Sequence, residues 1–172
     1  MNNIEQHIDA SAAEQKIWSI LATVVDPEVP VLTVLDLGIV RDVIINASEV
    51  EVIITPTYTG CPAMDMIAMN IRLALAEQGY KQVKITSVLS PAWTTDWMTE
   101  AGKEKLKQYG IAPPNPKQQV CNDQLFAANE AVQCPHCNSH HTHRISEFGS
   151  TACKALYQCD DCKEPFDYFK CH

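Results

Sequence analysis

The chain has 172 residues, a formal net charge of −8 and a hydrophobic content of 46%, which is ordinary for a globular protein. No apolar run approaches the length of a membrane span, and the N-terminus lacks the basic and apolar stretches of a signal peptide. Neither half carries the basic patch that nucleic-acid binding requires. We therefore expect a cytoplasmic protein that binds neither membranes nor nucleic acid and holds one ordinary domain plus a small one.

The first part of the chain predicts alternating helices and strands. Ser11 and Glu14 form a capping box for the first helix, and Gly79 and Gly110 end the second and third helices. The order α-β-β-α-β-α predicts a compact α+β domain over residues 1–111. The expected elements are a helix over 16–25, strands over 37–46 and 50–55 with a turn at 46–48 between them, a helix over 63–78, a strand over 82–89, and a helix from Thr94 or Thr95 to about Tyr109.

Residues 112–132 contain three prolines and several amide side chains, with little apolar periodicity. This composition predicts a linker, in which residues 123–131 could form a short helix. The remaining segment, residues 133–172, is expected to be a separate small domain.

Two Cys-x-x-Cys pairs mark that small domain. Cys134 and Cys137 are followed, after 21 intervening residues, by Cys159 and Cys162. Four thiolates at this spacing suit tetrahedral zinc, and a hairpin-sized spacer can bring the pairs together. We therefore predict a structural zinc site in a small β-ribbon, and a reducing compartment in place of a disulfide framework.

The roles of the other cysteines and of the histidines near this site are less clearly indicated by the sequence. Cys153 either packs beside the metal as a small apolar residue or contributes a further thiol ligand. Cys121 is expected to be free in the linker, and Cys171 and His172 could fold back to ligate, although chain ends usually fray. The four histidines of this region are expected to be solvated loop residues: His136, His140, His141 and His143. Of these, His136 lies inside the first knuckle and could tune the metal site without ligating the metal.

Cys61 is the candidate reactive residue of the first domain. It lies between an expected strand and an expected helix, and Pro62 suits the first helical position, so Cys61 is placed at the N-cap. Free backbone N–H groups and the positive end of the helix dipole would favour its thiolate, and Gly60 leaves the approach open. Position alone is equally consistent with a cysteine that packs as a small apolar residue.

Several blocks of the sequence carry a family resemblance. Those of the first domain are Asp26-Pro27-Glu28, Asp36-Leu37-Gly38-Ile39-Val40, Thr55-Pro56-Thr57 and Gly60-Cys61-Pro62. They resemble the signature of small iron–sulfur cluster assembly domains (FSCA-type, SufT-like). The runs 147–157 and 164–170, joined to such a domain, are similar to the PaaD family of proteins encoded with the multicomponent phenylacetyl-CoA epoxidase of aerobic phenylacetate breakdown.

This resemblance implies an accessory role beside an oxygenase subunit and a reductase subunit. The chain has no nucleotide-binding glycine loop and no Glu-x-x-His pair for a di-iron bundle, so it lacks the parts for either catalytic task. We expect Cys61 to hold or deliver a transient iron–sulfur cluster for the reductase, in a homodimer if a cluster is shared, while the zinc ribbon docks the target.

Two other functions stay open. The four-cysteine site could hold iron and transfer electrons like a rubredoxin, although rubredoxin-like knuckles usually carry Gly where this chain has Asn138 and Lys163. Alternatively, the chain could be a standing structural subunit of the oxygenase complex.

Overall fold

The computed structural model describes residues 12–46, 49–114 and 132–170. The contacts between residues divide the chain into two compact units, residues 1–102 and residues 103–172, which are described separately. Several sequence-based expectations lie outside the described residues: the cap at Ser11, part of the 46–48 turn, the short helix over 123–131, Cys121, Cys171 and His172.

The first unit is a three-stranded sheet with the order β1-β2-β3. β1 (Val40–Asn46) pairs antiparallel with β2 (Glu49–Ile54), and β2 pairs parallel with β3 (Gln82–Ser87). Helix α2 (Ala63–Glu77) connects the two parallel strands, and helix α1 (Ala12–Leu21) precedes the sheet. This order confirms the expected α+β class.

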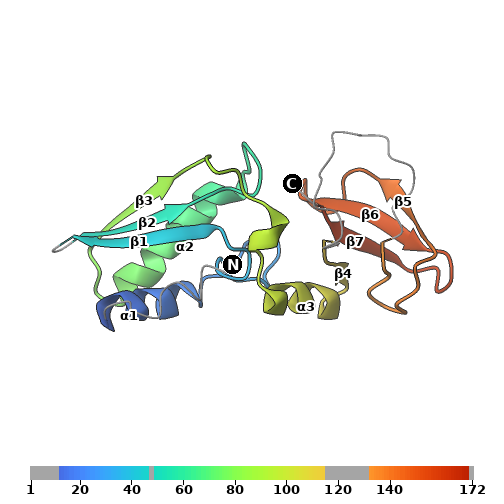
Figure 1. The fold of residues 1–172 in the computed structure, drawn as a ribbon, viewed down its shortest axis with the longest axis horizontal. Coiled ribbons are helices and arrows are strands. Elements are labelled where there is room, and N and C mark those ends of the chain that lie inside the picture. Colours follow the sequence, from blue (N-terminus) through green and yellow to red (C-terminus); the bar gives the residue numbers. More distant parts are fainter. Residues whose placement is uncertain (1–11, 47–48, 115–131, 171–172) are drawn as a thin grey trace. The chain divides into compact units, whose positions relative to one another are not determined.

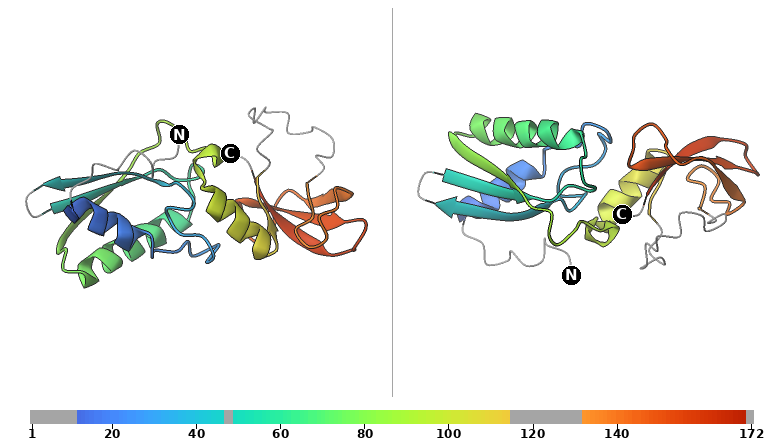
Figure 2. Two further views of the ribbon diagram at one scale, coloured as in Figure 1. Left: turned by 60° about the horizontal axis from the view of Figure 1, so that its bottom comes forward. Right: turned by 90° about the horizontal axis from the view of Figure 1, so that it is seen from above.

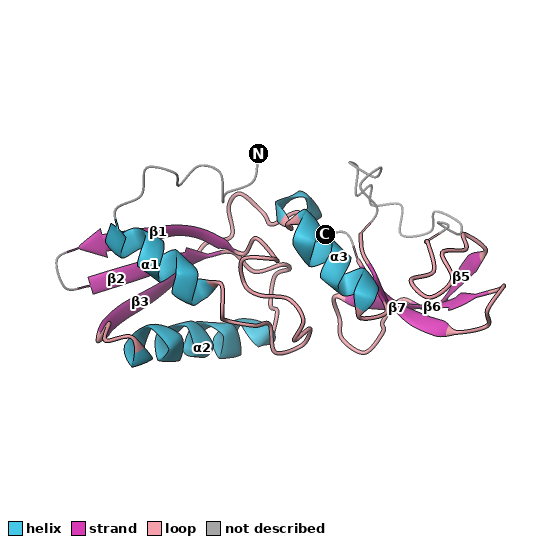
Figure 3. Ribbon diagram, turned by 90° about the horizontal axis from the view of Figure 1, so that it is seen from below, coloured by secondary structure: helices cyan, strands magenta, loops and turns pink. Residues whose placement is uncertain are grey.

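Helices α1 and α2 lie on one face of the sheet (Figures 1 and 3). Strand β2 alternates, with Val50, Val52 and Ile54 buried, as expected for a sheet that covers a core on one side only. Helix α2 contributes the facing stripe at a spacing of four residues: Ala63, Ile67, Ile71 and Leu75. The core of this unit therefore lies between the sheet and the two helices, and it positions the loop that joins β2 to α2.

The largest differences from the expected boundaries concern three elements, whereas the bounds of β2 and β3 differ by only one or two residues. Helix α1 begins and ends earlier than the expected range of 16–25. β1 begins only at Val40, because Gly38 has a φ of 67° and the preceding residues form a turn. The helix expected over 94–109 is wrong: a 3₁₀ turn, Thr95–Trp97, is separated by the extended Met98 from helix α3 (Glu100–Gln108). The Thr99 hydroxyl caps α3 by accepting the N–H of Gly102.

The second unit contains a four-stranded sheet with the order β4-β7-β6-β5, whose last three strands along the chain, β5 to β7, are seen in orange and red in both views of Figure 2. β5 (Thr142–Ser146), β6 (Lys154–Cys159) and β7 (Pro165–Phe169) are antiparallel neighbours, and the short β4 (Ile111–Ala112) pairs parallel with β7. Two of the predicted ligands, Cys134 and Cys159, belong to the small core of this unit. The buried residues of that core are Ala112, Val132, Cys134, Ala155, Tyr157, Cys159, Phe166 and Tyr168.

The division between the units falls within α3, earlier than the boundary at residue 111 that composition suggests. The reason is that Ile111 and Ala112 are hydrogen-bonded into the ribbon sheet, which composition cannot reveal. Among the helices in the described ranges, none is both long and apolar enough to cross a membrane.

Candidate metal centre and thiol site

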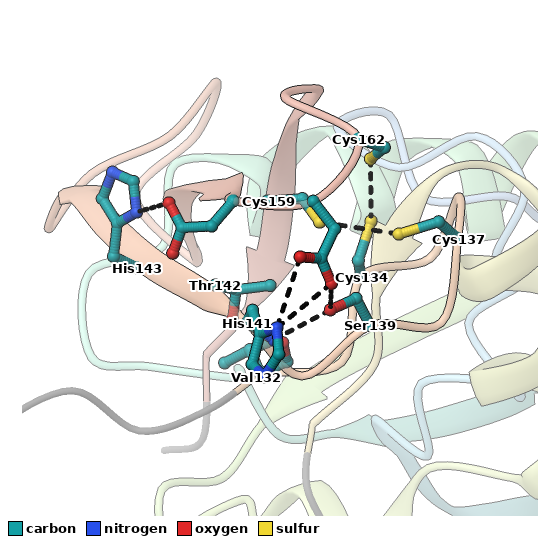
Figure 4. Close-up of polar contacts among 11 residues, drawn as sticks. Val132, Cys134, Cys137, Ser139, His141, Thr142, His143, Cys159 and Cys162 are labelled. Carbon is teal, nitrogen blue, oxygen red and sulfur yellow. Dashed lines mark hydrogen bonds and ion pairs between the residues drawn. The ribbon is translucent and has the colours of Figure 1, made fainter.

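The four cysteines of the two Cys-x-x-Cys pairs come together at one end of the ribbon, with their sulfurs turned toward one another (Figure 4). All four Sγ atoms lie within 4.8 Å of one another. The Sγ atoms of Cys134 and Cys162 are 3.8 Å apart, and those of Cys137 and Cys159 are 3.5 Å apart. None of the four forms a disulfide.

These distances fit a tetrahedral metal site. A Zn–S bond of about 2.3 Å places tetrahedral thiolates about 3.8 Å apart, close to the two separations in this structure. A disulfide would require sulfurs at about 2.05 Å. The donor set is therefore suited to zinc or to another ion that binds four thiolates, and a closed set of four protein ligands is typical of a structural site.

The two knuckles have the same backbone conformation. In each, the residue after the second cysteine has a positive φ, 61° for Asn138 and 65° for Lys163. The N–H of each donates to the carbonyl of the first cysteine of its pair, at 2.9 Å and 3.0 Å. Asn and Lys thus adopt the left-handed conformation that favours glycine. The missing glycines are therefore no argument against a rubredoxin-like knuckle.

The neighbouring cysteines shift the pKa values of Cys159 and Cys162 in opposite directions. The backbone N–H of Cys162 donates to the sulfur of Cys159 and, with that of Asp161, lowers the pKa of Cys159 to about 7. The N–H of Glu164 lowers the pKa of Cys162, but desolvation and the neighbouring cysteine sulfurs raise it to about 12. The Cys162 thiol therefore resists ionisation on its own, whereas a divalent cation bound to the site would stabilise its ligands as thiolates.

Polar side chains connect the second knuckle to the first knuckle and to β5 (Figure 4). The Asp161 carboxylate accepts the Ser139 hydroxyl and lies 3.2 Å from Nδ1 of His141. The Asp160 carboxylate lies 3.0 Å from Nδ1 of His143. These two histidines are exposed, as expected, but His143 lies in β5 and not in a loop, and each of the two is paired with a carboxylate. Asp161 therefore bridges segments that are about twenty residues apart in sequence.

Cys153 is not part of the four-thiol group. It is buried, and its sulfur lies 3.0 Å from the hydroxyl of Thr151. The structure therefore supports its role as a small packed residue and not as a ligand of this site.

Cys61 lies in the loop between β2 and α2. It is partly exposed, and a Cβ built on Gly60 would meet nothing within 4 Å, so this side of the loop is open. Helix α2 begins at Ala63 with Pro62 as its N-cap. Cys61 was expected at the N-cap and therefore lies one residue before that position. Its sulfur nevertheless accepts the backbone N–H of Ala63 and a hydrogen bond from Tyr58.

The expectation that Cys61 has a lowered pKa is wrong. Burial raises the pKa of the thiol, more than the hydrogen bonds from Ala63 and Tyr58 lower it, and the nearby carboxylates of Glu28 and Asp26 raise it further. The helix terminus helps the thiolate through one N–H, but desolvation and two negative charges oppose it. Burial and the two carboxylates therefore favour the thiol form of Cys61 over the thiolate.

The carboxylates beside Cys61 were missed as site residues. Asp26 is buried and accepts the backbone N–H groups of Glu28 and Val29, at 2.8 Å and 2.7 Å, which shapes the turn between α1 and β1. The sequence marks Asp26-Pro27-Glu28 only as a helix stop and as one block of a resemblance. The tertiary fold brings that block close to Cys61.

The two units together define a protein that joins an iron–sulfur assembly-type domain to a cysteine-ligated zinc ribbon. The family described as "Iron-sulfur cluster assembly protein" matches residues 14–87, and the family described as "PaaD zinc beta ribbon domain" matches residues 118–170.

A protein of Escherichia coli (strain K12), named as one subunit of a "Putative 1,2-phenylacetyl-CoA epoxidase", is 51% identical over 91% of this chain and 92% of its own length. The chain therefore belongs to the PaaD family, as its C-terminal motifs indicate. The "Fe-S protein maturation auxiliary factor" of Porphyromonas gingivalis is 40% identical over 54% of this chain and 90% of its own length. The crystal structure of a "Domain of Unknown Function DUF59" from Bacillus anthracis superposes with a TM-score of 0.52 at 26% identity, covering 55% of this chain and 92% of that one.

Proposed function

We propose that this chain is an accessory protein of a phenylacetyl-CoA epoxidase, in which Cys61 transiently holds iron or an iron–sulfur unit and passes it to the reductase. The observation that carries the proposal is an open loop that presents one cysteine next to Asp26 and Glu28 in an assembly-type domain. The names of the two relatives, an epoxidase subunit and a maturation factor, support the same pairing of roles.

The raised pKa of Cys61 suits a carrier more than a permanent ligand. Iron binds the thiolate and must displace the thiol proton, so a raised pKa weakens binding at neutral pH and favours release. Cys61 is also the single cysteine in residues 1–102, so a cluster held by this domain would need further thiols from outside the domain, for example from the client or from another copy of this chain. The ribbon, whose fold is closed around its own four cysteines, would bind the client.

The test is the iron and sulfide content of the reductase, purified from cells that express the wild-type chain, Cys61→Ser, or no chain. We expect the reductase from cells with Cys61→Ser to contain as little iron and sulfide as the reductase from cells without the chain. The Cys61→Ser protein itself should unfold at a temperature close to that of wild type, because Cys61 is partly exposed. Cys121→Ser, which removes a cysteine of the expected linker, is the matched control and should leave the cluster content unchanged. Full cluster content with Cys61→Ser would exclude the transfer role.

A standing subunit is the second candidate, and the name of the Escherichia coli relative favours it. It predicts co-purification with the oxygenase in fixed stoichiometry and a reductase whose cluster does not depend on this chain. A red protein with one iron in the four-cysteine site would add electron transfer to that role, because the left-handed Asn138 and Lys163 permit the knuckle geometry.

A further inference from the structure

Each knuckle is preceded by a glutamine, and the two glutamines make the same hydrogen bond. The Gln133 side chain donates from Nε2 to the backbone carbonyl of Asn138, at 3.2 Å. The Gln158 side chain donates to the carbonyl of Lys163, at 3.0 Å. The residues between the cysteines differ, Pro-His in one knuckle and Asp-Asp in the other. The shared feature is therefore the glutamine and the carbonyl that it holds.

The carbonyl in each case belongs to a peptide group whose other end contacts a metal-site sulfur. The peptide that joins Asn138 to Ser139 accepts Gln133 at its carbonyl and donates its N–H to the sulfur of Cys137. The peptide that joins Lys163 to Glu164 accepts Gln158 and donates its N–H to the sulfur of Cys162. Hydrogen bonds that share a polarisable group strengthen one another, so each glutamine both orients the N–H and increases its attraction for a thiolate.

The two sulfurs that receive these N–H groups belong to the cysteines that are not fully buried, although Cys162 packs against the edge of the core. Cys134 and Cys159 are fully buried in the ribbon core, whereas Cys137 is exposed and Cys162 is partly buried. Packing therefore fixes the first cysteine of each pair, and a hydrogen-bond relay is available to fix the second.

We propose that Gln133 and Gln158 are positioning residues of the metal centre, which act through one peptide group each to hold Cys137 and Cys162 as metal-binding thiolates. Neither glutamine ligates the metal. Backbone hydrogen bonds close each knuckle independently, from Asn138 to Cys134 and from Lys163 to Cys159, so the ribbon folds without the glutamine side chains. The inference concerns the metal centre alone and holds whether or not Cys61 carries iron.

The test uses the full-length protein with cobalt(II) as a visible substitute for zinc. We compare Gln133→Ala, Gln158→Ala and the double variant with Gln108→Ala, a control whose amide is also hydrogen-bonded, to Glu104 at 3.1 Å, but outside the site. Each single variant should bind cobalt and zinc more weakly than wild type. The metal affinity of the double variant should fall about 10- to 100-fold, the usual effect of removing a residue that supports a metal ligand. The four-thiolate cobalt spectrum should persist, and the control should match wild type.

A second readout separates a relay from a general loss of stability. With cadmium-113 in the site, NMR can detect coupling from an amide proton to the metal through the N–H···S bond. Gln133→Ala should weaken the coupling of Ser139 only, and Gln158→Ala that of Glu164 only. Gln158→Lys, which keeps a donor, should restore affinity in part, whereas Gln158→Glu should not.

The proposal is overturned if the double variant keeps wild-type metal affinity and both couplings. It is equally overturned if that variant loses the four-thiolate spectrum altogether, or if Gln158→Lys and Gln158→Glu behave alike, because the glutamines would then have a merely structural role.

Discussion

Cys61 shows how a residue's chemistry depends on neighbours that are distant in sequence. The local motif places a thiol before a helix, where backbone N–H groups favour its ionised form. Burial is the main effect that opposes ionisation, and Asp26 and Glu28, more than thirty positions earlier in the chain, add to it with their negative charge. The outcome is a thiol with a raised pKa, which is suited to reversible binding.

Glu28→Gln should therefore activate Cys61. Removing this negative charge lowers the thiol pKa and increases the thiolate fraction below that pKa. Alkylation by iodoacetamide at pH 7–8 should be about two- to fivefold faster than in wild type, as expected for an interaction of about 0.5–1 kcal/mol between partly exposed charges. The rate of both proteins should rise with pH, with the variant's profile displaced to lower pH.

Asp65→Asn is the control for this measurement, because Asp65 is an exposed acid in the first turn of α2 that does not contribute to the shift of Cys61. An alkylation profile for Glu28→Gln that coincides with those of Asp65→Asn and wild type would show that Glu28 does not act on the thiol.

At the scale of the element, each knuckle is a turn that depends on one left-handed residue. Lys163 occupies this conformation with a side chain that disfavours it, whereas Asn138 tolerates it better. The turn persists because a backbone hydrogen bond from Lys163 to Cys159 closes it and the cysteines converge on one centre.

Lys163→Gly should stabilise the ribbon. It relieves left-handed strain of about 1–2 kcal/mol, and the greater freedom of glycine in the unfolded chain offsets part of that gain. The net effect should be about 0.5–1 kcal/mol in the stability of the zinc-loaded ribbon, measured by denaturant unfolding at fixed free zinc.

Lys163→Ala removes the same side chain but keeps the left-handed strain, so its zinc-loaded ribbon should be as stable as that of wild type. If glycine and alanine have the same effect, the lysine side chain and not its backbone conformation would determine the stability of the turn.

The whole molecule consists of two compact units with different sources of stability. The first unit has a core between a sheet and two helices. The second has a small core in which two of eight buried residues are metal-site cysteines, so its folding depends on the metal. Structural zinc contributes about 10–16 kcal/mol in small domains of this kind.

Removing the metal should therefore unfold the second unit alone. After chelation, or in Cys159→Ser, amide hydrogen exchange should become fast from β5 to β7, because Cys159 is both a ligand and a core residue. Peptides that cover β2 and α2 should keep their protection. A ribbon that stays protected after complete metal removal would contradict this account, and Cys153→Ser, at a buried cysteine outside the site, controls for the loss of a thiol.

The sequence by itself determined the features that depend on short spacings. These are the metal site of Cys134, Cys137, Cys159 and Cys162, the order of helices and strands in the first unit, and the open turn before α2, because cysteine spacing, apolar periodicity and Gly or Pro signals act within a few residues. Only the tertiary structure decided the properties that need distant segments. It brought Asp26 and Glu28 to Cys61, joined Ile111 and Ala112 to β7, split the last expected helix, and made Asp161 a bridge between the knuckles. Such long-range contacts depend on how the whole chain buries its apolar faces, and no local pattern specifies them.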